Sequence, residues 1–396
     1  MRVVIMNDYL IFGGAEMQGR REKKLLESKG HEAYLVTFDQ NFKNDSNEFS
    51  EENGFINIPI PNSKVDKVKG HFMFHKDLYD NIREVLIKLK PDIIHVNNFY
   101  LAPLTQYKAL EGFKAVQTIR DYTAVCPKST CIYKDNTVCK GANQNNCFLE
   151  CTSLKIVPKI IMFNNVYELK KKYINKFICP SEKLTEYCKD MGFDVVCINN
   201  PFDFSKLEGF NKRVDYNKKK YMYYGVIDDN KGVYQLIDAF NEFSKDKDVE
   251  LIIAGKADEE HTKKLQSYLG NEKIKYLGFL SYDDCLKQLE EVYCVVVPSL
   301  WMENYPNTVL ESLSTGTLVL GSDRGGIPDM LKDNKGIIFD VLNKESIINA
   351  LNKSYNMDKT EYEEITERAK KFSISNNTIE RYYENIMGLF EEVINR

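Results

Sequence analysis

Short apolar runs alternate along the whole chain with longer amphipathic stretches. In the first half the runs are residues 3–6, 33–38, 93–96, 115–119, 177–179 and 195–198. In the second half they are residues 221–224, 251–254, 274–277, 292–297, 318–320 and 337–339. Continuous runs of this length, bounded by glycine, proline or charge, are typical of parallel strands covered on both faces by helices. The pattern therefore predicts an α/β protein with two doubly wound sheets.

Apolar residues at helical spacing mark two further stretches. The stretch that follows the run at 221–224 has apolar residues spaced like one buried face of a helix: Leu236, Ile237, Phe240 and Phe243. The end of the chain has intervals of four and three residues that predict an amphipathic helix: Ile379, Tyr383, Ile386, Phe390 and Val393.

Two domains of ordinary size are expected, because 396 residues are long for a single hydrophobic core. A polar, lysine-rich segment at 203–220 separates the two sets of runs and is the predicted linker. The sequence thus predicts an N-terminal domain at 1–203 with a cysteine-rich insertion at 126–151. A C-terminal domain at 204–375 and a final helix at 376–396 follow.

Composition and charge exclude some classes of protein. Hydrophobic residues make up 43% of the chain and charged residues 28%, as in globular proteins. The net charge of −4 excludes a generally basic, nucleic-acid-coating protein, so no nucleic-acid partner is expected. Residues 1–203 carry 28 basic and 25 acidic side chains, whereas the remainder carries 26 and 33. The first half either faces an anionic surface or presents a solvated basic face.

Neither a membrane span nor an export signal is expected from the pattern. No apolar stretch reaches the ~18 residues that a spanning helix requires. The first residues reach Asn7 and Asp8 without the apolar segment of a signal peptide. We therefore expect a cytoplasmic protein whose ten cysteines are mostly reduced thiols.

Two loops that follow predicted strands suit a phosphate ligand. Gly13 and Gly14 precede a helix, where glycines allow close approach and the first turn offers free N–H groups. The dinucleotide fingerprint G-x-G-x-x-G is absent, so NAD binding is not supported. Lys231 precedes the helix near Val233 and adds a full charge to its positive end. The plain alternatives are a tight turn for the glycines and a solvated side chain for Lys231.

The segment 303–311, with the sequence ENYPNTVLE, is the most specific candidate. Pro306 suits the first turn of a helix and Gly316 suits its end. Glu303 then lies in the loop at the mouth of the sheet, and Glu311 lies about one and a half turns into the helix. Free main-chain donors of the helix start lie between the two carboxylates: Tyr305, Asn307 and Thr308. One carboxylate can bind a sugar and the other a ribose, which fits a nucleotide-sugar.

Glu303 and Glu311 form an E-x7-E pattern that resembles the retaining GT-B glycosyltransferases of family 4. Other segments resemble that family in the same order: Gly13-Gly14-Ala15-Glu16, Asn199-Asn200-Pro201-Phe202-Asp203, Gly225 to Lys231-Gly232, Leu251-Ile252-Ile253-Ala254-Gly255 and Gly325-Gly326-Ile327-Pro328-Asp329. The resemblance spans nearly the whole chain. It implies a GT-B fold, with two facing Rossmann-like domains and a C-terminal helix that crosses back to the N-terminal domain.

The resemblance also implies roles for the candidate residues. Lys231 corresponds to the lysine that binds the diphosphate, Glu303 to the glutamate that contacts the sugar and Glu311 to the one that binds the ribose. Gly13 and Gly14 would lie against the donor phosphates. The helix start would supply the remaining donor contacts: Asn304, Tyr305, Pro306, Asn307 and Thr308.

The implied reaction is the transfer of a sugar from a nucleoside diphosphate sugar, with UDP as the expected nucleotide. It would retain the anomeric configuration and need no metal. The expected acceptor is a glycan or a lipid-linked oligosaccharide of surface polysaccharide synthesis.

Two positions depart from the family pattern. Val226 stands where similar sequences have an arginine that binds the diphosphate, and Arg324 is a candidate substitute. Arg120 stands where the family's T-x-H-D-Y segment has its histidine. Arginine stays protonated and cannot act as a general base, but it can contact a phosphate or a negatively charged sugar. Arg120 is therefore a candidate catalytic-site residue that marks an unusual donor or acceptor.

Half of the cysteines fall in the polar insertion: Cys126, Cys131, Cys139, Cys147 and Cys151. Their spacing is not that of a standard zinc ribbon, although related glycosyltransferases often carry a similar insertion. A polar loop has little core of its own, so a structural zinc would help to order it. Unliganded thiols are the alternative.

Residues 155–176 mix apolar residues with lysines, including the run Lys170-Lys171-Lys172. Such a stretch can lie on an anionic membrane, which would suit a lipid-anchored acceptor and a place at the inner face of the membrane. More often, such a stretch is an ordinary surface helix packed on its own domain. His95, at the end of a predicted strand, is either an acceptor-side residue or a hydrogen-bonded histidine below the cleft.

Two alternatives to a transferase stay open. A catalytically silent nucleotide-sugar-binding subunit is favoured by Val226 and Arg120, while Glu303, Glu311 and Lys231 count against it. The second alternative is a nucleotide-sugar epimerase or phosphorylase on the same fold.

Overall fold

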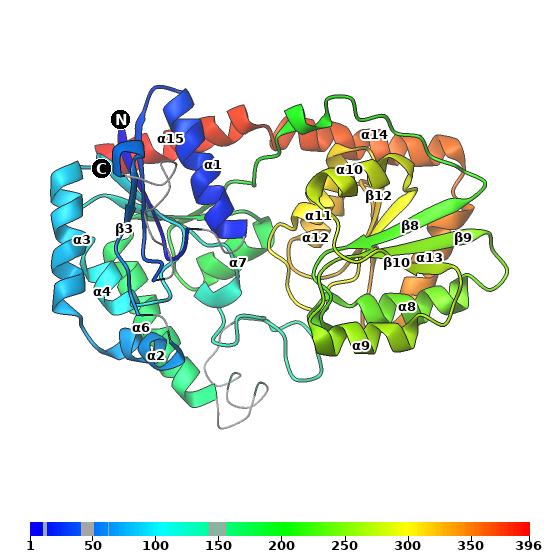
Figure 1. Cartoon of the computed structure of the whole chain (residues 1–396), viewed down its shortest axis with the longest axis horizontal. Coiled ribbons are helices and arrows are strands. Elements are labelled where there is room, and N and C mark those ends of the chain that lie inside the picture. Colours follow the sequence, from blue (N-terminus) through cyan, green and yellow to red (C-terminus); the bar gives the residue numbers. More distant parts are fainter. Residues whose placement is uncertain (11–13, 41–50, 62, 142–146, 148–150, 152–155) are drawn as a thin grey trace. The chain divides into compact units, whose positions relative to one another are not determined.

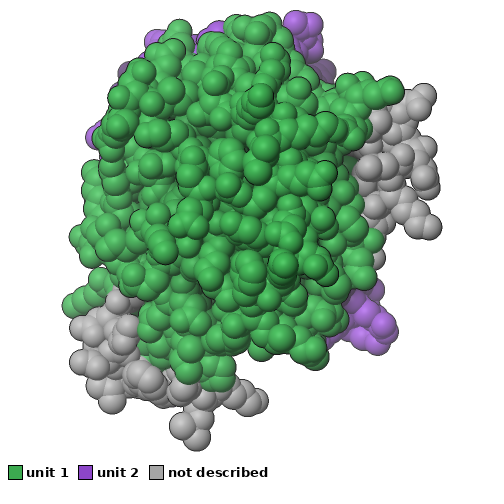
Figure 2. Space-filling view, turned by 90° about the vertical axis from the view of Figure 1, so that its left-hand side faces the viewer, with its two compact units in different colours: residues 1–131, 139–198, 383–396 green, residues 132–138, 199–382 purple. Residues whose placement is uncertain are grey.

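The computed structural model describes residues 1–10, 14–40, 51–61, 63–141, 147, 151 and 156–396 (Figure 1). The chain divides into two compact units, which are distinguished in Figure 2. Unit 1 comprises residues 1–131, 139–198 and 383–396, and unit 2 comprises residues 132–138 and 199–382. Each unit contains its own parallel sheet.

In the part of the chain that is described, unit 1 has a seven-stranded sheet with the order β3-β2-β1-β4-β5-β6-β7. The strands are β1 (Arg2–Asn7), β2 (Glu32–Thr37), β3 (Phe55–Asn57), β4 (Ile93–Val96), β5 (Ala115–Thr118), β6 (Lys176–Cys179) and β7 (Val195–Cys197). The helices are α1 (Gly14–Ser28), α2 (Lys64–Phe72), α3 (Lys76–Leu89), α4 (Pro103–Lys108), α6 (Ile156–Tyr173), α7 (Glu182–Asp190) and α15 (Ile379–Asn395).

All six apolar runs of the first half form strands of this sheet. The pattern missed β3, which is an edge strand of three residues. Only Phe55 of that strand is buried, so it shows no continuous apolar run. An edge strand of this length carries too little burial to be recognised from its sequence.

The last helix, α15, packs against unit 1, as the resemblance implied. The hydroxyl of Tyr383 lies 2.7 Å from Nε2 of His31. The ammonium of Lys176 donates to Oε1 of Glu392 at 2.7 Å. In Figure 1 the red C-terminal end of the chain accordingly lies against the blue elements of unit 1.

Among its described residues, unit 2 has a six-stranded parallel sheet with the order β10-β9-β8-β11-β12-β13. The strands, all six predicted from apolar runs, are β8 (Lys219–Tyr224), β9 (Val249–Ala254), β10 (Ile274–Tyr276), β11 (Cys294–Val297), β12 (Leu318–Ser322) and β13 (Ile337–Phe339). The helices are α8 (Val233–Phe243), α9 (Glu259–Tyr268), α10 (Tyr282–Glu291), α11 (Asn307–Ser314), α12 (Ile327–Leu331), α13 (Lys344–Asn356) and α14 (Lys359–Asn376).

Alternate residues of the central strand β8 enter two different cores. Tyr221 and Tyr223 pack with apolar residues of α8 and α13. Met222 and Tyr224 pack with apolar residues of α11 and α12. Because both faces of the strand are covered, every position of 221–224 is apolar or aromatic. The predicted buried face of α8 enters the first of these cores.

The segment at 203–220, predicted as a linker, belongs to unit 2. The units divide between Ile198 and Asn199, ahead of the predicted boundary. Phe204 and Phe210 pack against the second core of unit 2. The lysines and other polar residues of this segment hide these contacts in the sequence.

Lys212 fixes the same segment to the body of unit 2. Its ammonium donates to the main-chain oxygens of Leu289 and Val292 and to Oγ1 of Thr317, each at 2.6 Å. All three acceptors are uncharged, and burial lowers the pKa of Lys212 to about 7. A lysine typical of a solvated linker therefore anchors the segment through hydrogen bonds.

Candidate functional site

Two loops meet at the carboxyl edge of the unit 2 sheet, where β8 lies beside β11. The strands β9 and β10 come between them in the chain but lie on the other side of β8, so the strand order reverses at this point. Parallel α/β sheets bind ligands beyond the carboxyl ends of the strands at such a switch point. The loop after β8 carries Lys231, and the loop after β11 carries Glu303.

Lys231 and Glu303 form the centre of this site. The ammonium of Lys231 lies 2.7 Å from Oε1 of Glu303, with the two side chains 22% and 13% exposed. Oγ of Ser299 and Nε1 of Trp301 donate to the same oxygen at 2.7 and 2.8 Å. The ammonium also lies 4.5 Å from the centre of the Trp301 ring. Three donors therefore fix the carboxylate in a place where charges are weakly screened.

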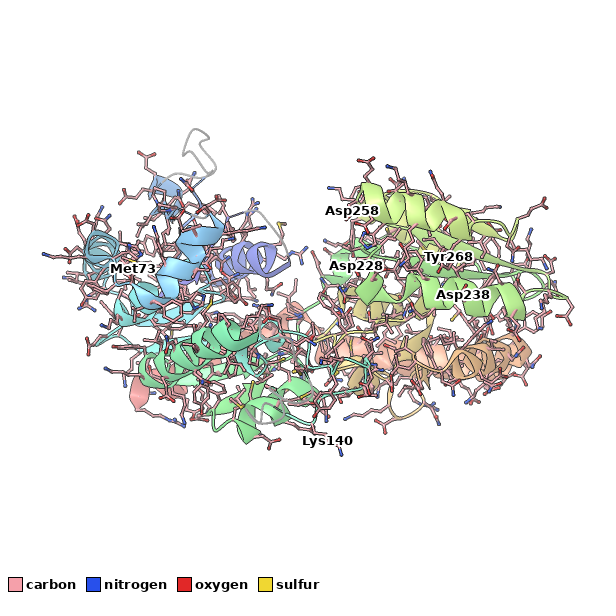
Figure 3. The ribbon with its side chains drawn as sticks, turned by 90° about the horizontal axis from the view of Figure 1, so that it is seen from below. Met73, Lys140, Asp228, Asp238, Asp258 and Tyr268 are labelled. Atoms are coloured by element: carbon pink, nitrogen blue, oxygen red, sulfur yellow. The ribbon has the colours of Figure 1, made fainter. Side chains whose placement is uncertain are left out.

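Local backbone geometry explains how the two loops reach each other. The carboxylate of Asp228, labelled in Figure 3, accepts a hydrogen bond from the N–H of Lys231 at 3.0 Å. Gly232 follows with φ +69°, and a Cβ atom there would lie 1.8 Å from the main-chain oxygen of Pro298. Only glycine permits this approach, which places Lys231 against the loop of Glu303.

Glu311 lies on α11 and is bonded to the last residue of β8. The hydroxyl of Tyr224 donates to Oε2 of Glu311 at 3.2 Å and to the main-chain oxygen of Thr308 at 3.1 Å. Burial raises the pKa of Tyr224 well above its ordinary value, so the hydroxyl stays a donor.

Three residues that hold the carboxylates were not among the predicted site residues: Tyr224, Ser299 and Trp301. Tyr224 ends an apolar run and resembles any core aromatic in the sequence. Trp301 is the only tryptophan of the chain and stands two residues before Glu303, which is the signal that could have found it.

The start of α11 lies between the two glutamates along the chain. Pro306 is the N-cap, with an extended backbone at ψ 127°, so it stands one position before the first helical residue. Asn307 and Thr308 begin the helix, and Asn304 belongs to the preceding loop. Ligand contacts of these residues stay predictions.

Tyr305 has a structural role in addition to its predicted one. Its side chain is 6% exposed, and its hydroxyl accepts a hydrogen bond from Nδ2 of Asn377 at 2.9 Å. The ring belongs to the core, so Tyr305 can serve a ligand only through its main chain.

Val226, which departs from the family pattern, and Arg324, the candidate substitute for the missing arginine, differ sharply in burial. Val226 is 54% exposed in the loop after β8. Arg324 is 2% exposed, and its Nε lies 3.2 Å from Oδ1 of Asp323. It adjoins Gly325 and Gly326, which contact the main chain of Glu303. A buried cation thus lies next to the Glu303 loop, and its role as a substitute for the missing arginine stays a prediction.

Of the residues predicted in unit 1, Gly13 lies outside the described residues and Gly14 begins α1. Arg120 lies in the loop after β5, where its Nη2 donates to Oδ1 of Asn97 at 2.8 Å. The amide nitrogen of Asn97 in turn donates to Oδ1 of Asn7 at 2.9 Å. The guanidinium is therefore held at the carboxyl edge of the unit 1 sheet.

His95 is fully buried in unit 1. Its Nδ1 is bonded to the carboxylate of Glu22, and its Nε2 lies 2.7 Å from Oγ1 of Thr118. Both ring nitrogens are bonded within the protein, which favours a hydrogen-bonded core histidine over an acceptor-side residue.

Four of the five cysteines of the insertion are buried, and Cys151 is partly exposed. The pKa of the Cys131 thiol is raised by a hydrogen bond with Cys126 and by burial. The nearby thiols of Cys139 and Cys147 raise it further. Across the described ranges, no three metal-binding side chains are placed to hold an ion. A zinc ion within 126–151 therefore stays a prediction for metal analysis. About one equivalent would support it, and far less than one would contradict it.

The lysine run of α6 is not a continuous basic face. Lys171 and Lys172 are exposed, but Lys170 is 6% exposed and lines a cavity of unit 1. None of the helices described is both long enough and apolar enough to span a membrane.

Comparison with known families identifies the domain that holds Lys231 and Glu303. Residues 206–372 match the sequence model described as "Glycosyl transferases group 1". Most of unit 2 is therefore similar to the group 1 glycosyltransferases. The matched residues include both loops of the site and the start of α11.

A curated relative resembles part of the chain. A stretch of 143 residues is 27% identical to an uncharacterised glycosyltransferase of Methanocaldococcus jannaschii. That stretch is 34% of the present chain, and it spans only 36% of the relative.

Solved structures resemble the chain over its whole length. Sucrose-phosphate synthase from Thermosynechococcus elongatus has a TM-score of 0.73 at 13% identity, covering 100% of this chain and 99% of that one. A glycosyltransferase from Rickettsia africae has a TM-score of 0.72 at 14% identity, with 99% and 98% covered. HepE from Anabaena, solved with UDP and glucose, has a TM-score of 0.70 at 15% identity, with 99% and 100% covered. The predicted GT-B fold class, with two Rossmann-like domains, is confirmed.

Proposed function

We propose that this protein is a metal-independent, retaining glycosyltransferase of family 4. It would move a sugar from a nucleoside diphosphate sugar to a glycan or a lipid-linked oligosaccharide. The observation that carries the proposal is the Lys231–Glu303 pair, which lies at the switch point of a group 1 domain. HepE was solved with UDP-glucose, which supports a UDP-sugar as the donor.

The proposed chemistry assigns different tasks to the charged groups. Glu303, fixed by its three donors, holds the sugar as positive charge develops on its ring. Lys231 and the first N–H groups of α11, on Asn307 and Thr308, stabilise the departing diphosphate. Glu311, oriented by Tyr224, accepts hydrogen bonds from the ribose.

We also propose that the acceptor belongs to surface polysaccharide synthesis and that the enzyme works in the cytoplasm at the inner face of the membrane. Support comes from the α2 surface, a patch of exposed apolar side chains: Val65, Val68, Phe72, Met73 and Phe74. Exposed lysines lie among them: Lys64, Lys69 and Lys76. Apolar side chains flanked by lysines suit an anionic lipid surface. The α2 surface therefore replaces the lysine run of α6 as the candidate membrane contact.

The substitution Glu303→Gln tests the proposal, because it removes the charge and keeps the shape of the side chain. A panel of nucleotide-sugars is first screened by thermal shift, since a ligand that binds only the folded state raises its stability. The donor that responds is then used in a transfer assay with candidate glycan acceptors. We expect Glu303→Gln to lower transfer by about 100-fold or more. The matched control is Glu272→Gln, an exposed glutamate outside the site.

A catalytically silent nucleotide-sugar-binding subunit is the second candidate, and the exposed Val226 favours it. It predicts that a nucleotide-sugar binds but that neither transfer nor donor hydrolysis follows with any acceptor. Release of a sugar 1-phosphate that depends on added phosphate would instead indicate a phosphorylase. Absence of any nucleotide response in a folded sample would contradict the transferase proposal.

A further inference from the structure

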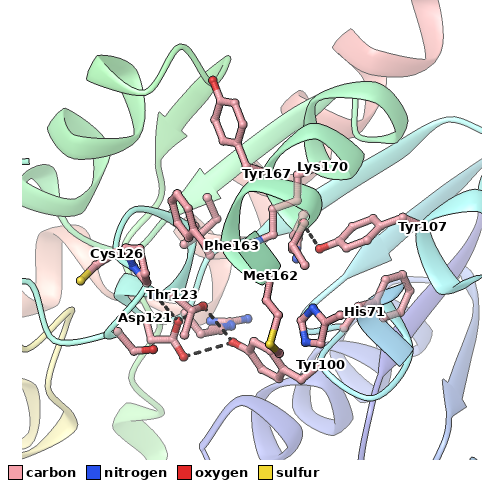
Figure 4. Close-up of a pocket in the computed structure, with 18 of the residues that line it drawn as sticks. His71, Tyr100, Tyr107, Asp121, Thr123, Cys126, Met162, Phe163, Tyr167 and Lys170 are labelled. Carbon is pink, nitrogen blue, oxygen red and sulfur yellow. Dashed lines mark hydrogen bonds between the residues drawn. The ribbon is translucent and has the colours of Figure 1, made fainter. Parts of the chain in front are cut away.

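Unit 1 contains a cavity of about 250 Å³ beyond the carboxyl ends of β4 and β5. Its walls include the loop after β4, the loop after β5 and one side of α6 (Figure 4). The volume is below the roughly 300–1,000 Å³ of sites that take drug-sized ligands, so the cavity suits a small head group.

Lys170 is the unusual residue of this cavity. It reaches in from α6 (Figure 4), and the whole residue is 6% exposed. Its ammonium has no hydrogen bond within the described part of the chain, and the carboxylate of Asp121 in the same wall acts on it only at longer range. Lysine is almost never buried without a partner, because an unpaired charge is strongly destabilised away from water. Burial accordingly lowers the pKa of Lys170.

A second orphaned group lies in the same wall. The Nδ1 atom of His71, a residue of α2 that lines the cavity, is buried and has no hydrogen-bond partner among the described residues. The unpaired ring nitrogen of His71 and the ammonium of Lys170 therefore border one cavity. Native proteins pair such groups with protein, water or ligand.

The charges around the cavity favour an anion. Arg120 lines it with a guanidinium oriented by Asn97, and Lys159 adds a further cation. Asp121 is the acidic member of the described lining. Its carboxylate accepts hydrogen bonds from Oη of Tyr100 at 3.1 Å and from the N–H of Thr123 at 2.9 Å. Lys170, Arg120 and Lys159 thus leave an excess of positive charge beside the open volume.

The remaining wall is apolar. Phe99, Met162 and Phe163 line the cavity beside its charged groups. Aromatic and apolar side chains can pack against the C–H face of a sugar ring, while cations fix a charged substituent. The combination suits a sugar that carries an anionic group better than a neutral one.

We propose that this cavity binds an oxyanion, a phosphate or a carboxylate, carried by the acceptor sugar, with Lys170 as its main charge partner. That the bound molecule is the acceptor rests on the proposed function. Binding of the oxyanion itself does not, so it can be measured without donor and without turnover. Arg120, the residue that departs from the family's histidine, then contributes to acceptor specificity.

Isothermal titration calorimetry with three hexose probes tests the proposal: glucose 6-phosphate, glucuronate and methyl glucoside. The substitution Lys170→Met removes the charge and keeps an unbranched side chain of similar length. The matched control is Lys172→Met, an exposed lysine of the same helix. We expect one or both anionic sugars to bind the native protein and the control, and Lys170→Met to bind them at least about tenfold more weakly.

The two anionic probes distinguish the sources of the oxyanion. A preference for glucose 6-phosphate identifies a phosphorylated acceptor, and a preference for glucuronate identifies an acidic sugar. Equal binding of all three probes, no binding of the anionic ones, or unchanged affinity in Lys170→Met would overturn the proposal. Removal of an unpaired buried charge should not lower the melting temperature. If Lys170→Met still fails to fold, Arg120→Gln provides the second variant. It is expected to weaken the binding of the two anionic probes and to leave the binding of methyl glucoside unchanged.

Failure of this proposal and failure of the proposed function give different results. Binding of a nucleotide-sugar by the group 1 domain is read from its own thermal shift and from Glu303→Gln. Donor binding without any response to the anionic sugars would overturn the anion site and leave the transferase proposal in place. Binding of the anionic sugars without any binding of a nucleotide-sugar would support the anion site and contradict the transferase proposal.

Discussion

Gly325 lies so close to Glu303 that a Cβ atom on it would come within 1.9 Å of the main-chain oxygen of Glu303. The same oxygen accepts a hydrogen bond from the N–H of Gly326 at 2.8 Å. The pair Gly325-Gly326 thus acts as a main-chain support for the loop that carries the carboxylate of Glu303, the proposed sugar-binding group. The φ of Gly325 is +58°, a conformation that side chains other than glycine rarely adopt.

Gly325→Ala is expected to lower the stability of the protein by about 1–3 kcal/mol, because it adds backbone strain and a clash with the Glu303 loop. It should also weaken the donor-dependent thermal shift, since Glu303 and its partners move together. Chemical denaturation and thermal shift measure the two effects. Gly270→Ala is the control, because its Cβ would meet no atom within 4 Å. Equal behaviour of the two variants would contradict the support role of Gly325.

Lys231→Met is expected to weaken binding of UDP by about 10- to 100-fold and to leave binding of uridine unchanged. The reason is that the ammonium is proposed to face the diphosphate and not the base. Titration calorimetry with the two ligands measures the difference. Lys263→Met, which alters an exposed lysine of α9, is the control. A similar loss of affinity for UDP and uridine would show that the substitution disrupts the site as a whole.

Lys212 is expected to make the stability of the protein depend on pH. In the folded protein the pKa of Lys212 is about 7, whereas a lysine in an unfolded chain has a pKa of ~10.4. Between pH 7 and pH ~10.4 the unfolded state therefore binds more protons than the folded state. The burial penalty is therefore fully present below pH 7 and is relieved as the pH rises above it.

The stability of the native protein relative to Lys212→Met should consequently rise between pH 6 and pH 9. The change is on the order of 2 kcal/mol. Urea unfolding at both pH values measures it, with the exposed Lys218→Met as the control. A stability difference between the two proteins that did not change with pH would show that the ammonium is not destabilised by its surroundings.

The α2 surface is expected to bind anionic vesicles. The double substitution Val68→Ser and Phe72→Ser removes two of its apolar side chains and should weaken vesicle binding by about tenfold or more. Co-sedimentation with vesicles of anionic and of neutral lipid measures the effect. Ile87→Ser is the control, because Ile87 is an equally exposed apolar residue of α3. An equal loss of vesicle binding in the double variant and in Ile87→Ser would contradict the membrane contact. So would the absence of vesicle binding by the native protein at low salt.

Much of the fold follows from the sequence because of the way in which parallel strands are buried. A strand covered on both faces must be apolar at every position, so twelve of the strands are visible as runs. The positions of turns and helix ends also follow from local sequence, because glycine marks them. Gly232 and Gly316 adopt positive φ where the sequence places a turn and a helix end. The short edge strand β3 lacks this signal, because only one of its three residues is buried.

The sequence by itself therefore determined the two doubly wound sheets, the last helix and the types of residue at the candidate site. Tertiary structure decided which of these residues meet. Lys231 and Glu303 are 72 positions apart and touch only because β8 and β11 are neighbours in the sheet. It also decided that Lys170 is buried and that Lys212 is hydrogen-bonded within unit 2, although both stand in lysine-rich segments typical of solvated surfaces. The physical reason is that a side chain's burial depends on what packs against its element, and that packing brings together segments distant in the chain.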